Sequence, residues 1–230
     1  MNIIKSKGFT ITEIMISLLI ASMVIINVVV VFETNIISAN IQKEMVRTQN
    51  RTESAMRFVV NDVSNAGASF GGEDFEKNPF DWDETTYSEN GNDSFKVVYN
   101  NLTENDAFTC GETTATDTIE NRYRVVNGIL YCNSLRLAGY VEKFKILFLA
   151  DLNGDGEPDK LLTPDVAKTV SEDNTKRIVG AKIMILVSNS SPITNYKYSN
   201  NYKFKNTELD TSENKIYSYI IRHIVFKNMI

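Results

Sequence analysis

Histidine and cysteine are scarce in this sequence. His223 is the only histidine, and Cys110 and Cys132 are the only cysteines. Structural zinc sites are usually built from four cysteine or histidine ligands, so this supply argues against a metal centre of that type. A phosphate-binding glycine loop, a nucleophile elbow and a paired acid–base signature are also missing. An enzyme is therefore the weakest of the functional hypotheses.

A broad excess of positive charge is missing too. The 230 residues carry a formal net charge of −5. If the short segment up to Gly8 were removed, the loss of Lys5 and Lys7 would take the side-chain charge to −7. An acidic body argues against a nucleic-acid-binding domain that depends on a general basic field, although it leaves room for a local basic patch.

Glycine and proline are absent between Phe9 and Asn65. The run from Ile14 to Phe32 is apolar and long enough to span a bilayer as a helix, since ~20 residues suffice. Beyond it, residues recur at the three- and four-residue steps of an amphipathic helix, namely Ile37, Ile41, Met45, Thr48, Thr52, Ala55, Val59 and Val63. We therefore predict one helix from Phe9 to about Ala66, with Gly67 as its stop.

The short segment before the apolar run has an unusual order. Lys5 and Lys7 stand before Gly8, whereas a secretory signal peptide places its apolar core before the cleavage site and loses it. The positive leader predicts a cytoplasmic N-terminus and a single crossing of the membrane. Glu13 lies at the head of the run, where an ionised group at the bilayer centre costs at least ~2.5–3.5 kcal/mol. A cut after Gly8 would free an α-amino group at Phe9. That group, on the same or a neighbouring subunit, would pair with the Glu13 carboxylate.

The residues Gly8-Phe9-Thr10-Ile11-Thr12-Glu13 resemble the processing site of type IV prepilins and pseudopilins. In that family a prepilin peptidase cuts after the glycine and methylates the new N-terminal phenylalanine, and the glutamate is implicated in subunit docking. The alternative is an ordinary membrane anchor. The resemblance implies a leader at 1–8, a transmembrane helix at 9–32, an amphipathic stalk helix at 33–67 and a β-rich head at 68–230.

Three segments of the body resemble PilW-type minor pilins. They are the helix end from Arg57 to Gly67, the strand from Val179 to Ser188 and the C-terminal strand from Arg222 to Asn228. The region from Phe70 to Thr118 matches no motif of that family. The resemblance implies an inner-membrane protein with a periplasmic head that then enters a pilus fibre at the cell surface.

The same resemblance implies a role and partners. The chain would be a minor pilin at or near the pilus tip, which supports pilus assembly for motility, adhesion or DNA uptake. Its partners would be other minor pilins, the major pilin, the prepilin peptidase, an inner-membrane assembly platform and, before assembly, membrane lipid. A pseudopilin of a type II secretion system and a membrane-anchored, calcium-dependent adhesin are the alternatives.

The body itself predicts a β-rich fold. Strands are expected at 94–100, 122–126, 129–132, 141–150, 178–188 and 215–228, and Asn127-Gly128 is a strong signal for a tight hairpin. The segment from Ala68 to about Asn92 is expected to be a long loop. A long helix followed only by strands predicts an α+β arrangement in which an antiparallel sheet packs on the helix.

Cys110 and Cys132 are expected to form a disulfide if the body lies outside the cytoplasm, in an oxidising compartment. Closing a loop of this size contributes ~2–4 kcal/mol. The alternative is a pair of free buried thiols.

A calcium-type loop is the sharpest motif of the body. Asp151, Asn153, Asp155 and Asp159 offer side-chain oxygens, and Glu157 offers its carbonyl, in the spacing of EF-hand loops. Leu162 stands where the bidentate acid is expected, so calcium would bind weakly, with a dissociation constant of ~10⁻⁴–10⁻³ M. No other cofactor is expected. The alternative is an acidic, glycine-rich turn that binds nothing.

Two other features favour structural interpretations. His223 lies in an apolar strand without a catalytic or metal-ligand context, so a core or edge role is expected. Aromatic and basic residues alternate near the C-terminus in a way that single-stranded nucleic acid would fit, but a solvated loop is the simpler interpretation; they are Tyr196, Lys197, Tyr198, Tyr202, Lys203 and Lys205.

Overall fold

The computed structural model of the chain describes residues 8–68, 79–100, 110, 118–171, 177–193, 202–204, 207–209, 211 and 214–226. The chain divides into two compact units, Met1–Glu44 and Met45–Ile230, which are treated separately below. Several predicted features lie outside the described residues. They are the leader up to Lys7, the parts 70–78, 101–109 and 111–117 of the segment without a family motif, and Tyr196, Lys197, Tyr198 and Lys205.

Helix α1 spans Ile11–Val63, so the predicted long helix is present and is shorter by a few residues at each end. It ends in a turn at residues 64–67, where the Asn65 amide bonds to the Asp62 carbonyl and the Ala66 amide to the Val63 carbonyl. Gly67 follows with a φ of 72°, a conformation that glycine adopts without strain. Gly67 is therefore the stop that its position predicts.

The first sheet has the order β1-β2-β3-β4, with all neighbours antiparallel. Its strands are β1 (Phe95–Asn100), β2 (Thr118–Val126), β3 (Ile129–Cys132) and β4 (Leu135–Gly139). Asn127 and Gly128 join β2 to β3 with φ values of 51° and 71°, as a two-residue hairpin turn requires. The predicted hairpin is confirmed, whereas β4 was not expected.

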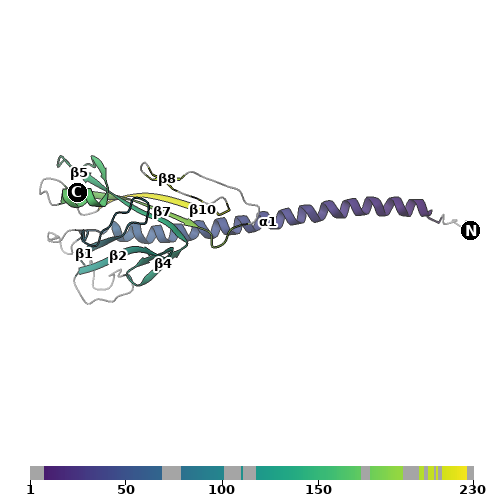
Figure 1. The fold of residues 1–230 in the computed structure, drawn as a ribbon, viewed down its shortest axis with the longest axis horizontal. Coiled ribbons are helices and arrows are strands. Elements are labelled where there is room, and N and C mark those ends of the chain that lie inside the picture. The colour runs from purple at the N-terminus through teal and green to yellow at the C-terminus, as the bar shows by residue number, and fades with distance from the viewer. Residues whose placement is uncertain are drawn as a thin grey trace, which may run out of the picture. The chain divides into compact units, whose positions relative to one another are not determined.

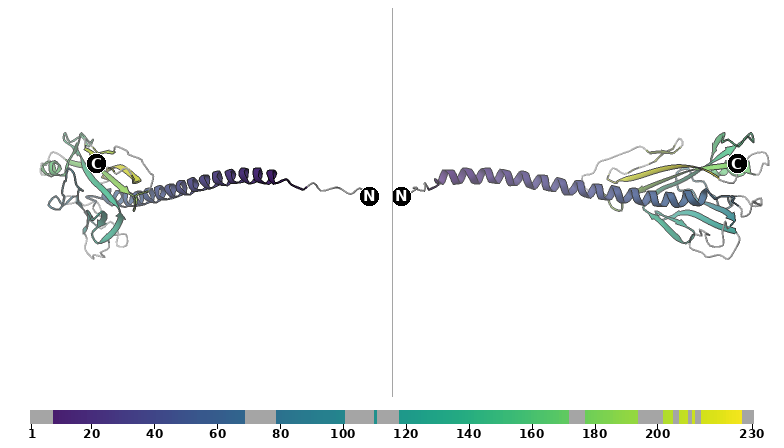
Figure 2. Two further views of the ribbon diagram at one scale, coloured as in Figure 1. Left: turned by 45° about the vertical axis from the view of Figure 1, so that its right-hand side comes forward. Right: turned by 180° about the vertical axis from the view of Figure 1, so that it is seen from behind.

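The second sheet has the order β10-β7-β5-β6 and is also antiparallel. Its strands are β5 (Val141–Asp151), β6 (Lys160–Leu162), β7 (Arg177–Ser188) and β10 (Tyr217–Val225). Strands β8 (Tyr202–Phe204) and β9 (Thr207–Leu209) form a separate hairpin. Figures 1 and 2 show the two four-stranded sheets on opposite sides of the C-terminal part of α1, which belongs to the same unit.

A second helix, α2 (Pro164–Ser171), corrects the expectation that only strands follow α1. Thr163 and Pro164 give it an ordinary start, because proline is favoured at the first helical position. Eight residues are too short for a clear apolar period, and only Pro164 and Ala167 are buried along it. The α+β fold class is confirmed.

The core forms where α1 meets the inner faces of both sheets. Ala55, Met56, Val59 and Val63 of α1 are fully buried. They belong to one apolar cluster with residues of the first sheet, including Phe95 and Tyr123, and of the second, including Phe144 and Ile183. Burial of this apolar face, at roughly 25 cal/mol per Å², is the main force that holds the last turns of α1 in the head.

The segment from 79 to 94 has little regular structure, as predicted, but it is tied to β5. The Asp93 carboxylate accepts hydrogen bonds from the amides of Ser88 (2.9 Å) and Ile146 (3.0 Å). It also forms a buried ion pair with Lys145, with 3.2 Å between Nζ and Oδ1. These bonds satisfy a carboxylate that would otherwise be buried without partners.

Candidate functional site

The predicted cleavage position is open to an approaching protein. Phe9 is 84% exposed, and a Cβ placed on Gly8 would find no atom within 4 Å. The two residues directly precede the first turn of α1. Nothing in the described chain therefore shields the Gly8–Phe9 bond, and its role in processing stays a prediction.

Thr10 and Glu13 form a reciprocal cap at the start of α1. The Glu13 carboxylate accepts hydrogen bonds from the Thr10 amide and the Thr10 hydroxyl, both at 2.9 Å through Oε2. In return the Glu13 amide donates to Thr10 Oγ1 at 3.3 Å. This is a capping box, and the Thr-x-x-Glu spacing in the sequence is its signal.

The cap changes the account of Glu13. The sequence predicted that its carboxylate would need an α-amino partner, but Oε2 already has two donors on its own helix. Oε1 receives no hydrogen bond from the part of the chain that the structure describes. One oxygen thus fixes the side chain beside the helix start, and the other remains available to a cation.

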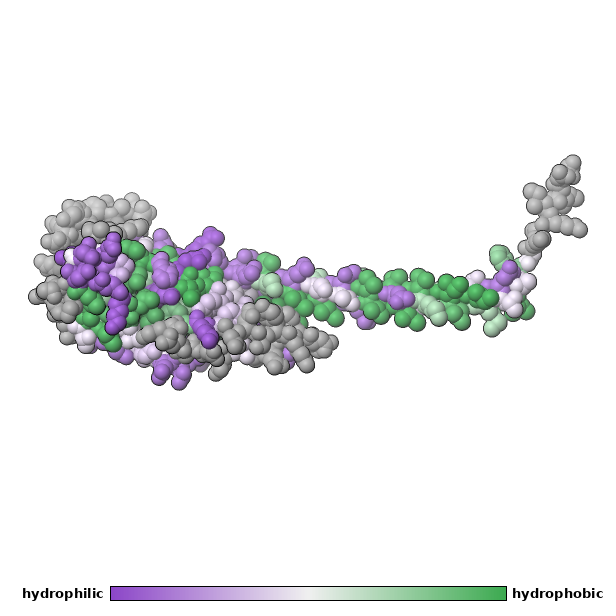
Figure 3. All heavy atoms as spheres, turned by 90° about the horizontal axis from the view of Figure 1, so that it is seen from above, coloured by the Kyte–Doolittle hydropathy of each residue, from purple (hydrophilic) through white to green (hydrophobic). Residues whose placement is uncertain are grey.

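The apolar segment of α1 has no protein neighbours in its own unit. Its large hydrophobic side chains from Ile11 to Phe32 are exposed, and none of the most apolar stretch is buried. Figure 3 shows them as a nearly continuous apolar surface with a few polar interruptions. By length and composition this helix is able to cross a membrane.

The polar side chains within the apolar segment bond to their own backbone. Ser17 donates to the Glu13 carbonyl and Ser22 to the Leu19 carbonyl, both at 2.7 Å. Asn27 Nδ2 donates to the Met23 carbonyl at 2.8 Å. Such bonds lower the cost of placing a hydroxyl or amide in an apolar medium. They leave the side-chain oxygen of Asn27, Oδ1, without a bond from this set.

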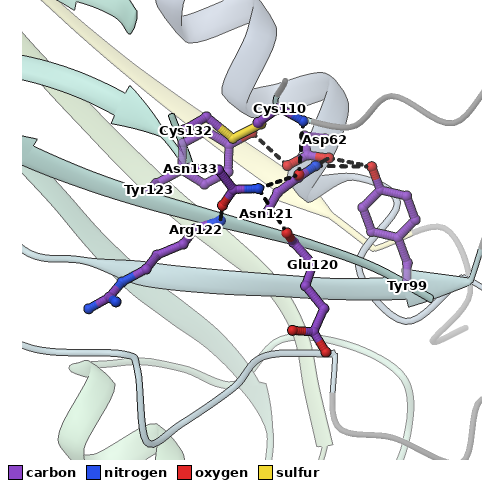
Figure 4. The surroundings of a disulfide bond; sticks show 9 residues. All are labelled: Asp62, Tyr99, Cys110, Glu120, Asn121, Arg122, Tyr123, Cys132 and Asn133. Atoms are coloured by element: carbon purple, nitrogen blue, oxygen red, sulfur yellow. Dashed lines mark hydrogen bonds between the residues drawn. A yellow bond between two sulfur atoms is a disulfide. The ribbon is translucent and has the colours of Figure 1, made fainter. Parts of the chain in front are cut away.

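At the other end of α1, Asp62 is the centre of a buried polar cluster (Figure 4). Its carboxylate accepts hydrogen bonds from the hydroxyls of Tyr99 and Tyr123, each at 2.5 Å, and from Asn121 Nδ2 at 2.9 Å. All four residues are almost completely buried. The cluster therefore fastens the end of the helix to β1 and β2.

Burial raises the pKa of the Asp62 carboxyl above its usual range, and the three hydrogen bonds only partly oppose this effect. Burial, together with the neighbouring Asp62 charge, also raises the pKa of Tyr99 and of Tyr123. Both tyrosines therefore keep their protons and act as donors. The four side chains are buried and bond to one another, which is typical of a structural cluster.

Cys110 and Cys132 form the predicted disulfide beside this cluster. The Cys110 amide donates to Asn121 Oδ1 at 3.2 Å, so Asn121 bridges the disulfide and Asp62. Among the described residues, the only trio of histidine, cysteine or acidic ligand atoms within 4.8 Å of one another is Asp62, Cys110 and Cys132. Because its two sulfurs are bonded to each other, that trio does not offer a metal site.

The loop between β5 and β6 holds its carboxylates with its own backbone. Asp151 accepts hydrogen bonds from the amides of Asn153, Gly154 and Gly156. Burial disfavours the charged form of Asp151, but these bonds outweigh it and hold the pKa of the carboxyl below its usual range. The Asp155 amide bonds to Asn153, the Glu157 amide to Asp155, and the Leu152 amide to Asp159. The five predicted calcium ligands thus share one loop, but no three of its carboxylates bring their oxygens within 4.8 Å of one another.

The remaining candidates have structural surroundings. His223 is exposed on β10, opposite Lys182 of β7, which fits the predicted edge role. Tyr202 packs against the rings of Tyr217 and Tyr219, and the Tyr219 hydroxyl donates to the Lys203 carbonyl. The ring of Tyr202 thus packs against other tyrosines of the head. Tyr202 and Lys203, the two described members of the predicted aromatic and basic set, therefore have structural contacts and do not support a nucleic-acid surface.

Comparison with known proteins gives two results. The model of the family described as Type IV Pilus-assembly protein W, PilW, matches residues 97–229. The solved structure of the type IV-like pilin TTHA1219 from Thermus thermophilus is similar, with a TM-score of 0.50 and 10% identity over 79% of this chain and 97% of that one. At that identity the likeness concerns the fold alone. No curated protein matches the chain.

Proposed function

The chain belongs to the PilW family of type IV pilus-assembly proteins, and from this premise we propose that it is a minor pilin that enters the fibre at or near the tip. Its role in pilus assembly is then structural and not enzymatic. The observation that carries the proposal is the N-terminal arrangement: an unshielded Gly8–Phe9 bond, a capped helix start at Thr10 and Glu13, and an apolar helix with no partner in its own unit.

The proposed path begins in the inner membrane. The positive leader stays in the cytoplasm, the apolar part of α1 crosses the bilayer and the head lies in the periplasm. A prepilin peptidase removes residues 1–8 and methylates Phe9. This path accounts for an apolar surface that, in water, would be a strong aggregation hazard.

Assembly then replaces lipid contacts with contacts between helices. Lipid tails are as apolar as leucine, so the net gain comes from close packing and from polar pairs and not from the hydrophobic effect. The available Oε1 of Glu13 accepts a hydrogen bond from the N-terminal ammonium of a neighbouring subunit, while Oε2 stays hydrogen-bonded to Thr10. The cap therefore orients the carboxylate before the neighbour arrives.

The head is proposed to meet other minor pilins and the major pilin, in a priming complex that supports fibre extension for motility, adhesion or DNA uptake. The second candidate is a pseudopilin of a type II secretion system, because the N-terminal features serve both machines. The match to a pilus-assembly family over residues 97–229 favours the pilus.

We further propose that the β5–β6 loop takes a calcium ion. An ionised Asp151 at its centre and positive φ values of 82° and 85° at Gly154 and Gly156 are compatible with a loop wrapped around a hard cation. Asp151, Asn153, Asp155 and Asp159 would provide side-chain oxygens, and Glu157 its carbonyl. A calcium titration of the full chain, with Asp155→Ala as the control, would test this, and equal responses of both proteins would dismiss it.

The test of the main proposal uses fibres sheared from cells that lack the native gene and express a tagged copy. The unchanged chain should be recovered in the fibre fraction, Gly8→Leu should remain in the inner membrane because its leader is not cut, and Ser6→Ala should behave like the unchanged chain. Recovery of Gly8→Leu in fibres would contradict the proposal. Loss of secreted proteins, with fibres unaffected, would favour the secretion-system alternative.

A further inference from the structure

One stretch of the head carries positive charge and no acidic residue. From Asn121 to Val141 the sequence has the arginines Arg122, Arg124 and Arg136 and neither aspartate nor glutamate, although the whole chain has a net charge of −5. The stretch forms the larger part of β2, all of β3 and β4, and the turns between them. The first sheet therefore holds a local basic patch of the kind that an acidic chain can still carry.

The arginines of this stretch lie on the outer face of the first sheet. Along β2, Tyr123 points to the core and is fully buried, whereas its neighbour Arg124 is exposed, as the alternation of side chains along a strand requires. Figure 4 shows Arg122, on the same face of β2 as Arg124, pointing away from the buried Asp62 cluster. The outer face is thus the face turned away from the core.

Arg124, Tyr131 and Arg136 form a row across three strands, here called the arginine–tyrosine row. Arg124 of β2 is paired with Tyr131 of β3, and Tyr131 is paired with Arg136 of β4. The Cβ atoms of directly paired residues lie about 4.5–5.5 Å apart. Both arginines are exposed and the tyrosine is half-buried. One aromatic ring therefore stands between two cations.

The two arginines of the row have no acidic partner in the described head. Their neighbour Arg122 does have one, since it forms an ion pair with Glu84 that has 3.2 Å between Nη1 and Oε2. No ion pair or hydrogen bond joins the guanidinium of Arg124 or Arg136 to any residue that the structure describes. The row thus offers two free guanidinium groups and a ring to a ligand.

A single-stranded nucleic acid matches this order of groups. An unpaired base stacks on an aromatic ring, and the phosphates that flank the base attract cations. In a duplex the bases are already stacked on each other, so the ring of Tyr131 would find no free base face. The acidic remainder of the chain repels a polyanion, which favours contact at this one face.

We propose that the arginine–tyrosine row binds single-stranded nucleic acid, with a base stacked on Tyr131 and phosphates bound by Arg124 and Arg136. The site goes beyond the proposed function, because it needs neither cleavage after Gly8 nor a fibre. Binding is expected to weaken as salt is added, since each phosphate contact releases counterions.

Fluorescence anisotropy of a short labelled oligothymidine, titrated with the full chain in detergent at low salt, tests the row. Tyr131→Ala should weaken binding by roughly 5-fold to 150-fold, the range for one lost stacking contact. Tyr131→Phe keeps the ring and should bind like the unchanged chain. Arg124→Gln changes an exposed side chain, and it should weaken binding and reduce the slope of log affinity against log salt by about 0.7, the value for one phosphate contact on a single strand.

The matched control is Arg177→Gln, which removes an exposed arginine at the start of β7 in the second sheet and should leave binding unchanged. Equal losses in Arg177→Gln and Arg124→Gln would overturn the proposal. So would equal affinity for an oligothymidine–oligoadenosine duplex or for polyglutamate, because either result indicates a general response to negative charge.

Two further outcomes would also contradict the row: no binding by the unchanged chain, or Tyr131→Ala that binds as tightly as Tyr131→Phe. Gly8→Leu, which should be absent from fibres, should still bind the oligothymidine normally. The proposed site and the proposed fibre role therefore fail independently of each other.

Discussion

The most consequential single residue of the head is Asp62, because three hydrogen-bond donors depend on it. Asp62→Leu would leave the hydroxyls of Tyr99 and Tyr123 and the Asn121 amide buried without their acceptor. We expect a loss of about 3–5 kcal/mol of stability. Urea unfolding of the full chain in detergent, followed by the fluorescence of Trp82, would measure it. Asp62→Asn is the matched control, since it keeps an acceptor and the shape, and it should be much milder.

The same carboxyl predicts a pH dependence. Because burial raises the pKa of folded Asp62 above its unfolded value, its contribution to stability is fully present below the unfolded pKa and is lost as the pH rises through the folded pKa. Asp62→Asn does not titrate. The stability of the unchanged chain minus that of Asp62→Asn should therefore fall from acidic to neutral pH, and a difference that rises over this range would contradict the buried-charge account.

At the helix start, Glu13→Gln separates the charge of Glu13 from its cap. Glutamine still accepts the Thr10 amide bond, as in a normal capping box, but it no longer attracts an ammonium. We expect normal removal of the leader and a strong loss of the chain from sheared fibres. Immunoblots of membrane and fibre fractions would show this. Fibres with a normal content of the variant would mean that the cap, and not the charge, is the function of Glu13.

What the sequence predicts at this scale depends on sequence distance. The Cys110–Cys132 pair could be predicted because only two cysteines exist. The Asp62 cluster could not, since its partners lie 37, 59 and 61 residues away. The cap at Thr10 has a local signal, the Thr-x-x-Glu spacing, which the charge of Glu13 does not by itself indicate.

At the scale of elements, Gly180 sets how closely β7 and β10 approach. A Cβ at this position would lie 2.3 Å from the Ile224 carbonyl oxygen, a backbone atom that moves only with its strand. Gly180→Ala should therefore destabilise the head by about 1–3 kcal/mol. Gly139→Ala is the control, because its Cβ would meet the movable end of the Arg136 side chain. Equal urea midpoints for the two variants would refute this close approach.

Elements with a strong local signal were predicted correctly. The long helix, the Asn127-Gly128 hairpin and the apolar strands β5 and β7 all carry such signals. The short elements β4, β6, β8, β9 and α2 were not predicted, because three to eight residues cannot establish a period; β8 and β9 form a hairpin where a solvated loop was expected. Their formation depends on neighbouring strands, which supply the partners that their own sequences do not specify.

For the molecule as a whole, the central claim is that this member of the PilW family is a processed fibre subunit. The family and the α+β fold rest on the comparison and on the structure. Processing, membrane orientation and tip position are proposals, because they depend on a peptidase, a bilayer and partner chains. Their shared premise is cleavage between Gly8 and Phe9.

The most direct test of that premise is the mass of the N-terminal peptide of the full chain, recovered from a host with an active prepilin peptidase. The account predicts a peptide that begins at Phe9 and carries one N-methyl group. A peptide that still begins at Met1, while a known prepilin in the same cells is cut, would contradict it. The chain would then be a membrane-anchored head and not a subunit of a fibre.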